Sequence, residues 1–147
     1  MLFRLGDDNF ALDTEEEPWK RTGLRIGLYA DPGSGKSYTA AIIVEQFLDQ
    51  GGTVVIFQPR AEWETVKIGY PDIQIVGGPR LQDIPFTASH PRLYADAVVE
   101  SGISLVFYTP DAPNIDKLVE FMSGFLDHLM KGLERERYTA LMLSETV

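Results

Sequence analysis

The residues of this 147-residue chain best suited to chemistry are a lysine and a serine that follow two glycines. In the run Gly33-Ser34-Gly35-Lys36-Ser37, the glycines would let successive backbone N–H groups converge on a phosphate. Lys36 would reach the β- and γ-phosphates of a nucleotide, and the hydroxyl of Ser37 would coordinate Mg²⁺. The run therefore predicts a phosphate-binding loop.

The elements on either side of the loop have the order that such a loop requires. Leu24 to Ala30 is predicted to be a strand, and Ser37 to Gln50 a helix whose N-terminus adds partial positive charge. Strand, loop and helix together are typical of a Walker A motif, although Ala30 replaces its first glycine. An ordinary glycine-rich turn is the alternative, and the GSGKS ending argues against it. The predicted nucleotide-binding residues are Asp31, Pro32, Gly33, Ser34, Gly35, Lys36, Ser37 and Tyr38.

A second candidate region lies at the end of the printed chain. Tyr138 to Leu143 reads as an apolar strand, and Ser144-Glu145 follows it. In a phosphate-loop protein, two acidic residues at such a strand end bind Mg²⁺ and orient the attacking water. Glu145 fits the catalytic role, whereas the Ser144 hydroxyl is a weak metal ligand because it carries no full negative charge. A plain strand end with a chance glutamate is the alternative.

A third candidate, Glu62, follows a β-branched run. Thr53 to Phe57 is predicted to be a strand buried on both faces, and the segment after a parallel strand lies at the sheet edge where ligands bind. Glu62 would then face the nucleotide or its attacking water, as a catalytic residue. Alternatively, Pro59 ends the strand and Glu62 caps a short helix that reaches Trp63 and Val66. The sequence position favours neither.

The remaining segments complete an alternating pattern of strands and helices. We expect the first 22 residues to be an N-terminal extension or short hairpin, and residues 23–147 to be an incomplete phosphate-loop core with an irregular insertion at 68–94. The other predicted elements are a short strand at Ile73–Val76, a helix at Leu93–Glu100, a strand at Ile103–Tyr108 and an amphipathic helix from Ile115. The apolar stripe of that last helix comprises Leu118, Val119, Phe121, Met122, Phe125, Leu126, Leu129, Met130 and Leu133. This pattern predicts an α/β fold.

Composition excludes several classes of site. The chain has no cysteine, so a disulfide framework, a thiolate metal site and a cysteine nucleophile are excluded. A formal charge of −9 argues against a broad basic surface for nucleic acid. No apolar run is long enough to span a bilayer, which predicts a cytoplasmic location without membrane contact.

With these motifs in order, the chain resembles the HerA/FtsK family of P-loop ATPases, particularly its HerA-like branch. The resemblance implies a three-layer P-loop NTPase sandwich with a mostly parallel sheet. It also implies a homo-oligomeric, hexameric motor that hydrolyses ATP with Mg²⁺ to translocate or process double-stranded DNA, in some cases with a nuclease partner. The stretches that carry it are LRIGLYADPGSGKSYTAAIIVEQFLDQGG, VVIFQPRAEWE, ISLVFYT with the helix after it, and LMLSE.

The resemblance assigns roles to individual residues. Lys36 and Ser37 match the phosphate and Mg²⁺ ligands, Glu145 matches the catalytic glutamate, and Glu62 matches the glutamate of the second-strand motif. That motif is Asp-Pro-x-Gly-Glu-aromatic in the family, and here Gln58 stands at the aspartate position. Ser144 likewise replaces the family's aspartate.

The printed chain ends at Val147, before the sensor strand and the arginine finger of the family. We therefore expect a truncated or degraded relative that lacks the C-terminal sensor strand and later elements. Two other functions stay open: a non-catalytic nucleotide-binding regulatory module, and a small-molecule kinase of the P-loop class.

Overall fold

The computed structural model describes residues 2–5, 10–13, 16, 27–29, 31, 33–58, 62–109, 115–136 and 140–144. They belong to two compact units, Met1–Gly52 and Thr53–Val147. The predicted domain boundary after residue 22 stays a prediction.

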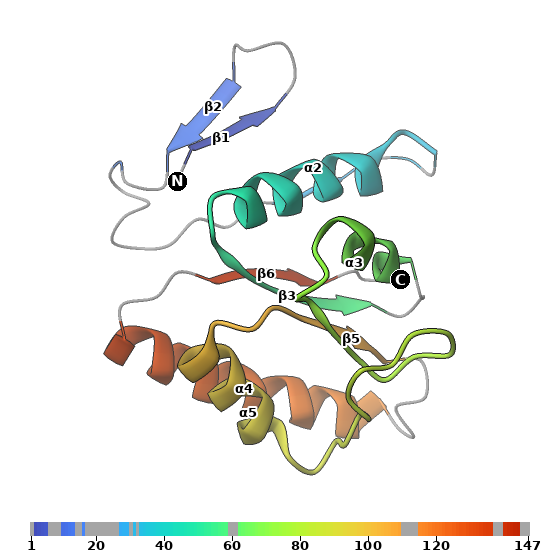
Figure 1. Ribbon diagram of the computed structural model, residues 1–147, viewed down its shortest axis with the longest axis vertical. Helices are drawn as coiled ribbons and strands as arrows, with labels where there is room; N and C mark the ends of the chain where they lie inside the picture. The colour runs from blue at the N-terminus through green and yellow to red at the C-terminus, as the bar shows by residue number, and fades with distance from the viewer. Residues whose placement is uncertain are drawn as a thin grey trace. The chain divides into compact units, whose positions relative to one another are not determined.

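The first unit contains the predicted hairpin. Strands β1 (Leu2–Leu5) and β2 (Phe10–Asp13) pair antiparallel, with Leu2 opposite Asp13 and Leu5 opposite Phe10 (Figure 1). The hairpin prediction is therefore confirmed.

Helix α2 (Lys36–Asp49) confirms the predicted helix to within one residue at each end. Its buried side chains, spaced as on one face of a helix, are Ala40, Ile43, Val44 and Phe47. The helix ends where the Gly51 N–H donates to the Leu48 carbonyl and the Gly52 N–H to the Phe47 carbonyl, each at 2.9 Å. These bonds satisfy carbonyls that a helix end would otherwise leave unpaired.

Two glutamines four residues apart, Gln46 in α2 and Gln50 at its C-cap, bond to the hairpin. The Gln46 side-chain amide bonds to both the N–H and the carbonyl of Arg4, each at 2.8 Å. Gln50 does the same to Leu2, at 3.0 and 3.1 Å. The two amides therefore act on β1 as a neighbouring strand would. They link the hairpin to the helix that begins at Lys36.

The strand predicted at Leu24–Ala30 is absent from the three of its residues that the structure describes. Gly27, Leu28 and Tyr29 form no strand, because none of them pairs with another strand in the part of the chain that the structure describes. Residues 24–26 and 30 lie outside the described residues. The alternating pattern had suggested a strand, but a strand exists only with a hydrogen-bonding neighbour.

The second unit contains a parallel sheet of four strands in the order β4-β5-β3-β6. Its strands are β3 (Thr53–Gln58), β4 (Gln74–Val76), β5 (Leu105–Tyr108) and β6 (Ala140–Ser144). The register places Val55 beside both Leu105 and Met142. Residues Val54 to Gln58 of β3 are all buried, as predicted for a strand covered on both faces. The fold is α/β with a parallel sheet, as expected for a P-loop NTPase domain.

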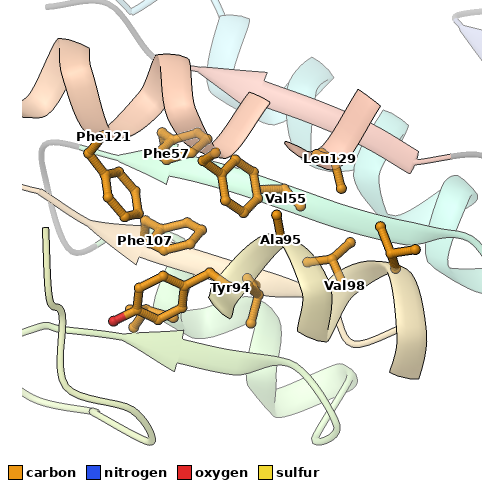
Figure 2. Close-up of a cluster of buried hydrophobic side chains, with 12 residues drawn as sticks. Val55, Phe57, Tyr94, Ala95, Val98, Phe107, Phe121 and Leu129 are labelled. Atoms are coloured by element: carbon orange, nitrogen blue, oxygen red, sulfur yellow. The ribbon is translucent and has the colours of Figure 1, made fainter. Parts of the chain in front are cut away.

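Two helices cover one face of this sheet: α4 (Pro91–Ser101) and α5 (Ile115–Glu136) (Figure 1). Aromatic rings fill the space between sheet and helices, as Figure 2 shows. Phe57 and Phe107 stack with ring centroids 4.8 Å apart, and Phe121 meets Phe107 edge-on at 5.5 Å. Such ring pairs add to the stability gained from burying apolar area.

The apolar stripe predicted for α5 is wrong in part. Phe121, Phe125 and Leu129 recur every four residues and are buried, whereas Val119 and Met130 are 56% and 55% exposed. The difference arises because one helix face includes only residues about three or four apart, and these two residues project from its sides. None of the described helices is long and apolar enough to cross a membrane.

Short elements follow β3 directly: the 3₁₀ turn η1 (Trp63–Thr65) and helix α3 (Val66–Gly69). His90 is exposed and stands at the N-cap position of α4, where its side chain makes no capping hydrogen bond.

Candidate functional site

The backbone of the phosphate loop adopts a conformation that only glycine accepts readily. Gly33 and Gly35 have φ angles of 83° and 87°, in the left-handed region. A Cβ atom built on either residue would meet no other atom within 4 Å. The space beside both glycines is therefore open, and a phosphate group can approach the backbone N–H groups there.

A short turn leads into this loop. The backbone N–H and the hydroxyl of Ser34 both donate to the Asp31 carbonyl, at 3.1 and 2.6 Å. Gly35 then takes the N-cap position of α2, where no side chain caps the helix. Since the first N–H groups of a helix have no intrahelical acceptor, those at the start of α2 remain available to a ligand.

The side chains predicted to bind the nucleotide face solvent. Lys36, Ser37 and Tyr38 are exposed, Tyr38 to 73%. Within the described residues, the side chains of Lys36 and Ser37 make no hydrogen bond or ion pair. Beside the loop is a cavity of about 220 Å³, lined by Gly27, Leu28, Tyr29, Ser34, Lys36 and Thr39.

These features fit a nucleotide with Mg²⁺: open N–H donors for phosphate oxygens, an unpaired ammonium and an unpaired hydroxyl. Of the predicted nucleotide-binding residues, Pro32 lies outside the described residues.

Glu62 lies in the turn that follows β3, in the second unit. It takes the N-cap position of η1, but its carboxylate makes no capping bond. The carboxylate is exposed, and the Glu62 carbonyl accepts a hydrogen bond from the Thr65 hydroxyl at 3.1 Å. The short helical turn is thus present, and the carboxylate remains free to act on a ligand.

Ser144 ends strand β6 beside the end of β3. The register pairs it with Phe57, one residue before Gln58. The carboxyl ends of parallel strands share one edge of a sheet, so Ser144 lies at the edge where ligands bind in this architecture. Its metal role stays a prediction, and Glu145 lies outside the described residues. No group of three or more metal-ligating side chains occurs among the residues that the structure describes.

Sequence reasoning gave no role to the side chain of Gln58. It is fully buried, and its Oε1 atom accepts hydrogen bonds from the backbone N–H groups of Glu62 and Trp63, at 3.1 and 2.8 Å. A polar residue at the end of a buried β-branched run was the available signal, because a buried amide needs hydrogen-bond partners.

The buried carboxylate of Glu64, 4% exposed, was also missed. So was the ion pair between Lys67 of α3 and Asp83. The hydrogen bond from Lys67, together with that from the Ile75 N–H at 2.8 Å, lowers the pKa of Asp83 below its ordinary value of 3.8.

Comparison with known proteins gives one match. A family model described as DUF87, the central domain of the helicase HerA, matches residues 23–136. The matched range includes the phosphate loop, Glu62 and helices α2 to α5, and it stops before β6. No curated protein and no solved structure matches the chain. Since the family model covers most of the 147 residues, the chain belongs to the HerA-like family of P-loop ATPases.

Proposed function

We propose that this chain is the ATP-binding domain of a HerA/FtsK-type motor, which hydrolyses ATP to translocate or process double-stranded DNA as a homo-oligomer. The observation that carries the proposal is the phosphate loop. Gly33 and Gly35 have left-handed backbones with open space beside them, and the exposed Lys36 and Ser37 have no partner within the described residues.

The residues would divide the chemistry between them. The loop N–H groups and Lys36 would bind the β- and γ-phosphate oxygens, and the Ser37 hydroxyl would hold Mg²⁺, which neutralises phosphate charge when bound. Glu145 would orient the attacking water, and Glu62 would face the nucleotide or that water. Ser144 would be a weak ligand at the position of the family's aspartate.

Double-stranded DNA, a hexameric assembly and a nuclease partner follow from the family resemblance, and a cytoplasmic location follows from the sequence. The formal charge of −9 is compatible with DNA in a central channel, because a ring of subunits needs only a few basic residues from each chain.

The first test is calorimetry of Mg·ATP binding to the parent chain and to Lys36→Ala. Loss of a charge-assisted contact should weaken affinity about tenfold to hundredfold. Lys131→Ala is the matched control, because it also removes an exposed lysine but lies in α5 rather than in the phosphate loop. The Lys131 side chain pairs with Asp127 at 2.7 Å on the surface of that helix. Equal affinity of the parent and Lys36→Ala would refute the proposed phosphate loop.

A non-catalytic nucleotide-binding module is the second candidate, and Ser144 favours it. We would compare ATP hydrolysis by the parent and by Ser144→Asp, with and without double-stranded DNA. Slow hydrolysis by the parent that rises in Ser144→Asp would mean that one metal ligand was lost. Lys36-dependent binding with no hydrolysis in either protein would favour the binding module.

A further inference from the structure

The turn that holds Glu62 depends on one buried side chain. We propose that Gln58 is a positioning residue, which sets the turn so that the Glu62 carboxylate is presented for ATP hydrolysis. The inference rests on the proposed function, because Glu62 is assigned there to face the nucleotide or its attacking water.

The first argument is the pair of hydrogen bonds that Gln58 accepts. Its Oε1 atom lies 3.1 Å from the Glu62 nitrogen and 2.8 Å from the Trp63 nitrogen. These N–H groups begin η1 and have no acceptor within their own helical turn. Gln58 thus closes the turn around Glu62 from a position four residues earlier in the chain.

The second argument is that Gln58 is itself fixed in the sheet. Its main chain pairs with Tyr108 of β5. Its carbonyl accepts hydrogen bonds from the N–H and the hydroxyl of Thr109, at 3.0 and 3.2 Å. The capping oxygen therefore projects from a backbone held by the neighbouring strand.

The third argument is the contrast between Glu62 and the residues that follow it. Trp63 is 5% exposed and Glu64 is 4% exposed, whereas Glu62 faces solvent. The turn therefore buries the two residues that follow Glu62 and leaves Glu62 itself exposed.

The fourth argument concerns the other end of the Gln58 amide. Its Nε2 atom is buried without a hydrogen-bond partner among the residues that the structure describes. An unpaired buried donor is unfavourable, so packing alone would favour an apolar residue here. The hydrogen bonds that Oε1 accepts therefore explain why this position holds a glutamine rather than an apolar residue.

The test uses two variants. Gln58→Met keeps the length of the side chain but removes the hydrogen-bond acceptor, whereas Gln58→Glu keeps an acceptor. For Gln58→Met we expect kcat for ATP hydrolysis to fall about tenfold to hundredfold, as for a misplaced catalytic group, with KM unchanged. Gln58→Glu should retain most of the kcat of the parent protein. Thr109→Val is the control, because it removes one bond to Gln58 but leaves the cap, and its kcat should equal that of the parent.

Two further readouts separate positioning from folding. In a Glu62→Ala background, Gln58→Met should cause no further loss of kcat, because both changes act through the same carboxylate. Amide hydrogen exchange at Glu62 and Trp63 should be faster in Gln58→Met than in the parent. If Gln58→Met does not fold, Gln58→Asn, whose shorter side chain draws the acceptor back, takes its place.

Three outcomes would overturn the inference: losses of kcat from Gln58→Met and Glu62→Ala that multiply when the two are combined, hydrogen exchange at the Glu62 and Trp63 amides that is the same in Gln58→Met as in the parent, or full activity of Glu62→Ala. Absence of hydrolysis by the parent would overturn it too. The proposed nucleotide site fails separately, if Mg·ATP binding does not depend on Lys36.

Discussion

The phosphate loop and the turn after β3 both carry predicted site residues, and they are held in opposite ways. In the loop, the described residues from Asp31 to Tyr38 are exposed, and the side chains of Lys36 and Ser37 make no hydrogen bond or ion pair with the described chain. In the turn, Gln58, Trp63 and Glu64 are buried around an exposed Glu62. The loop is shaped by its backbone, and the turn by its side chains.

The difference follows from what each region would bind. A loop that holds phosphate must leave most of its N–H groups available to the ligand, and here the Ser34 N–H alone among the described loop residues is shown bonded within the loop, to the Asp31 carbonyl. A carboxylate that faces the nucleotide or its attacking water gains from a support fixed before the ligand arrives.

The largest effect should come from the aromatic residue of the turn. Trp63→Ala removes a side chain that is 5% exposed and should lower the free energy of unfolding by about 3–5 kcal/mol. Tyr38→Ala, at a residue 73% exposed beside the phosphate loop, should leave it nearly unchanged. Urea unfolding followed by circular dichroism measures both. Similar losses in the two variants would remove the contrast between the regions.

A smaller effect is expected from the backbone of the loop. Gly35→Ala places a Cβ on a residue with φ of 87°, which costs roughly 1–2 kcal/mol, and it should also weaken Mg·ATP binding. Gly69→Ala in α3 is the control, because its Cβ would also meet open space but its φ is not left-handed. Thermal unfolding and calorimetry would be compared for both variants. Equal stability of the two would show that conformation does not constrain the loop.

Sequence patterns predicted the elements that depend on local periodicity. The β-branched run from Val54 to Phe57 became the central strand β3, and the helix after the phosphate loop was placed to within a residue. The glycine and lysine spacing identified the loop itself, because that chemistry depends on residues adjacent in the chain.

Features that depend on non-local partners were missed or misplaced. The ion pair from Lys67 to Asp83 joins residues 16 apart, whose proximity follows from the fold rather than from their spacing. The cap by Gln58 spans only four and five residues, but it depends on a turn whose geometry no repeating pattern indicates. The apolar stripe predicted for α5 wrongly included Met130, because the sequence gives the residue types but does not show which face of the helix packs against the sheet. The strand predicted before the phosphate loop failed at Gly27–Tyr29, since an apolar pattern does not supply a pairing partner.

The smallest effect should come from Asp83, which joins the helix after the turn to β4. Asp83→Asn removes the charge but retains an acceptor for the Ile75 N–H, so about 0.5–1 kcal/mol of stability should be lost near pH 7. Because the pKa of Asp83 is lowered in the folded state, this contribution is present above the ordinary value of 3.8 and disappears as the pH falls through the lowered value. Urea unfolding of parent and variant, repeated from about pH 7 down to about pH 3, should show the difference shrinking. Asp127→Asn is the comparison variant for a more exposed ion pair. Asp127 pairs with Lys131 at 2.7 Å on the surface of α5, and although this bond also lowers the pKa of Asp127, screening by solvent should leave a smaller difference in stability than at Asp83. A parent–variant difference that stays constant into acid would mean that Asp83 supports the turn through shape alone, without its charge.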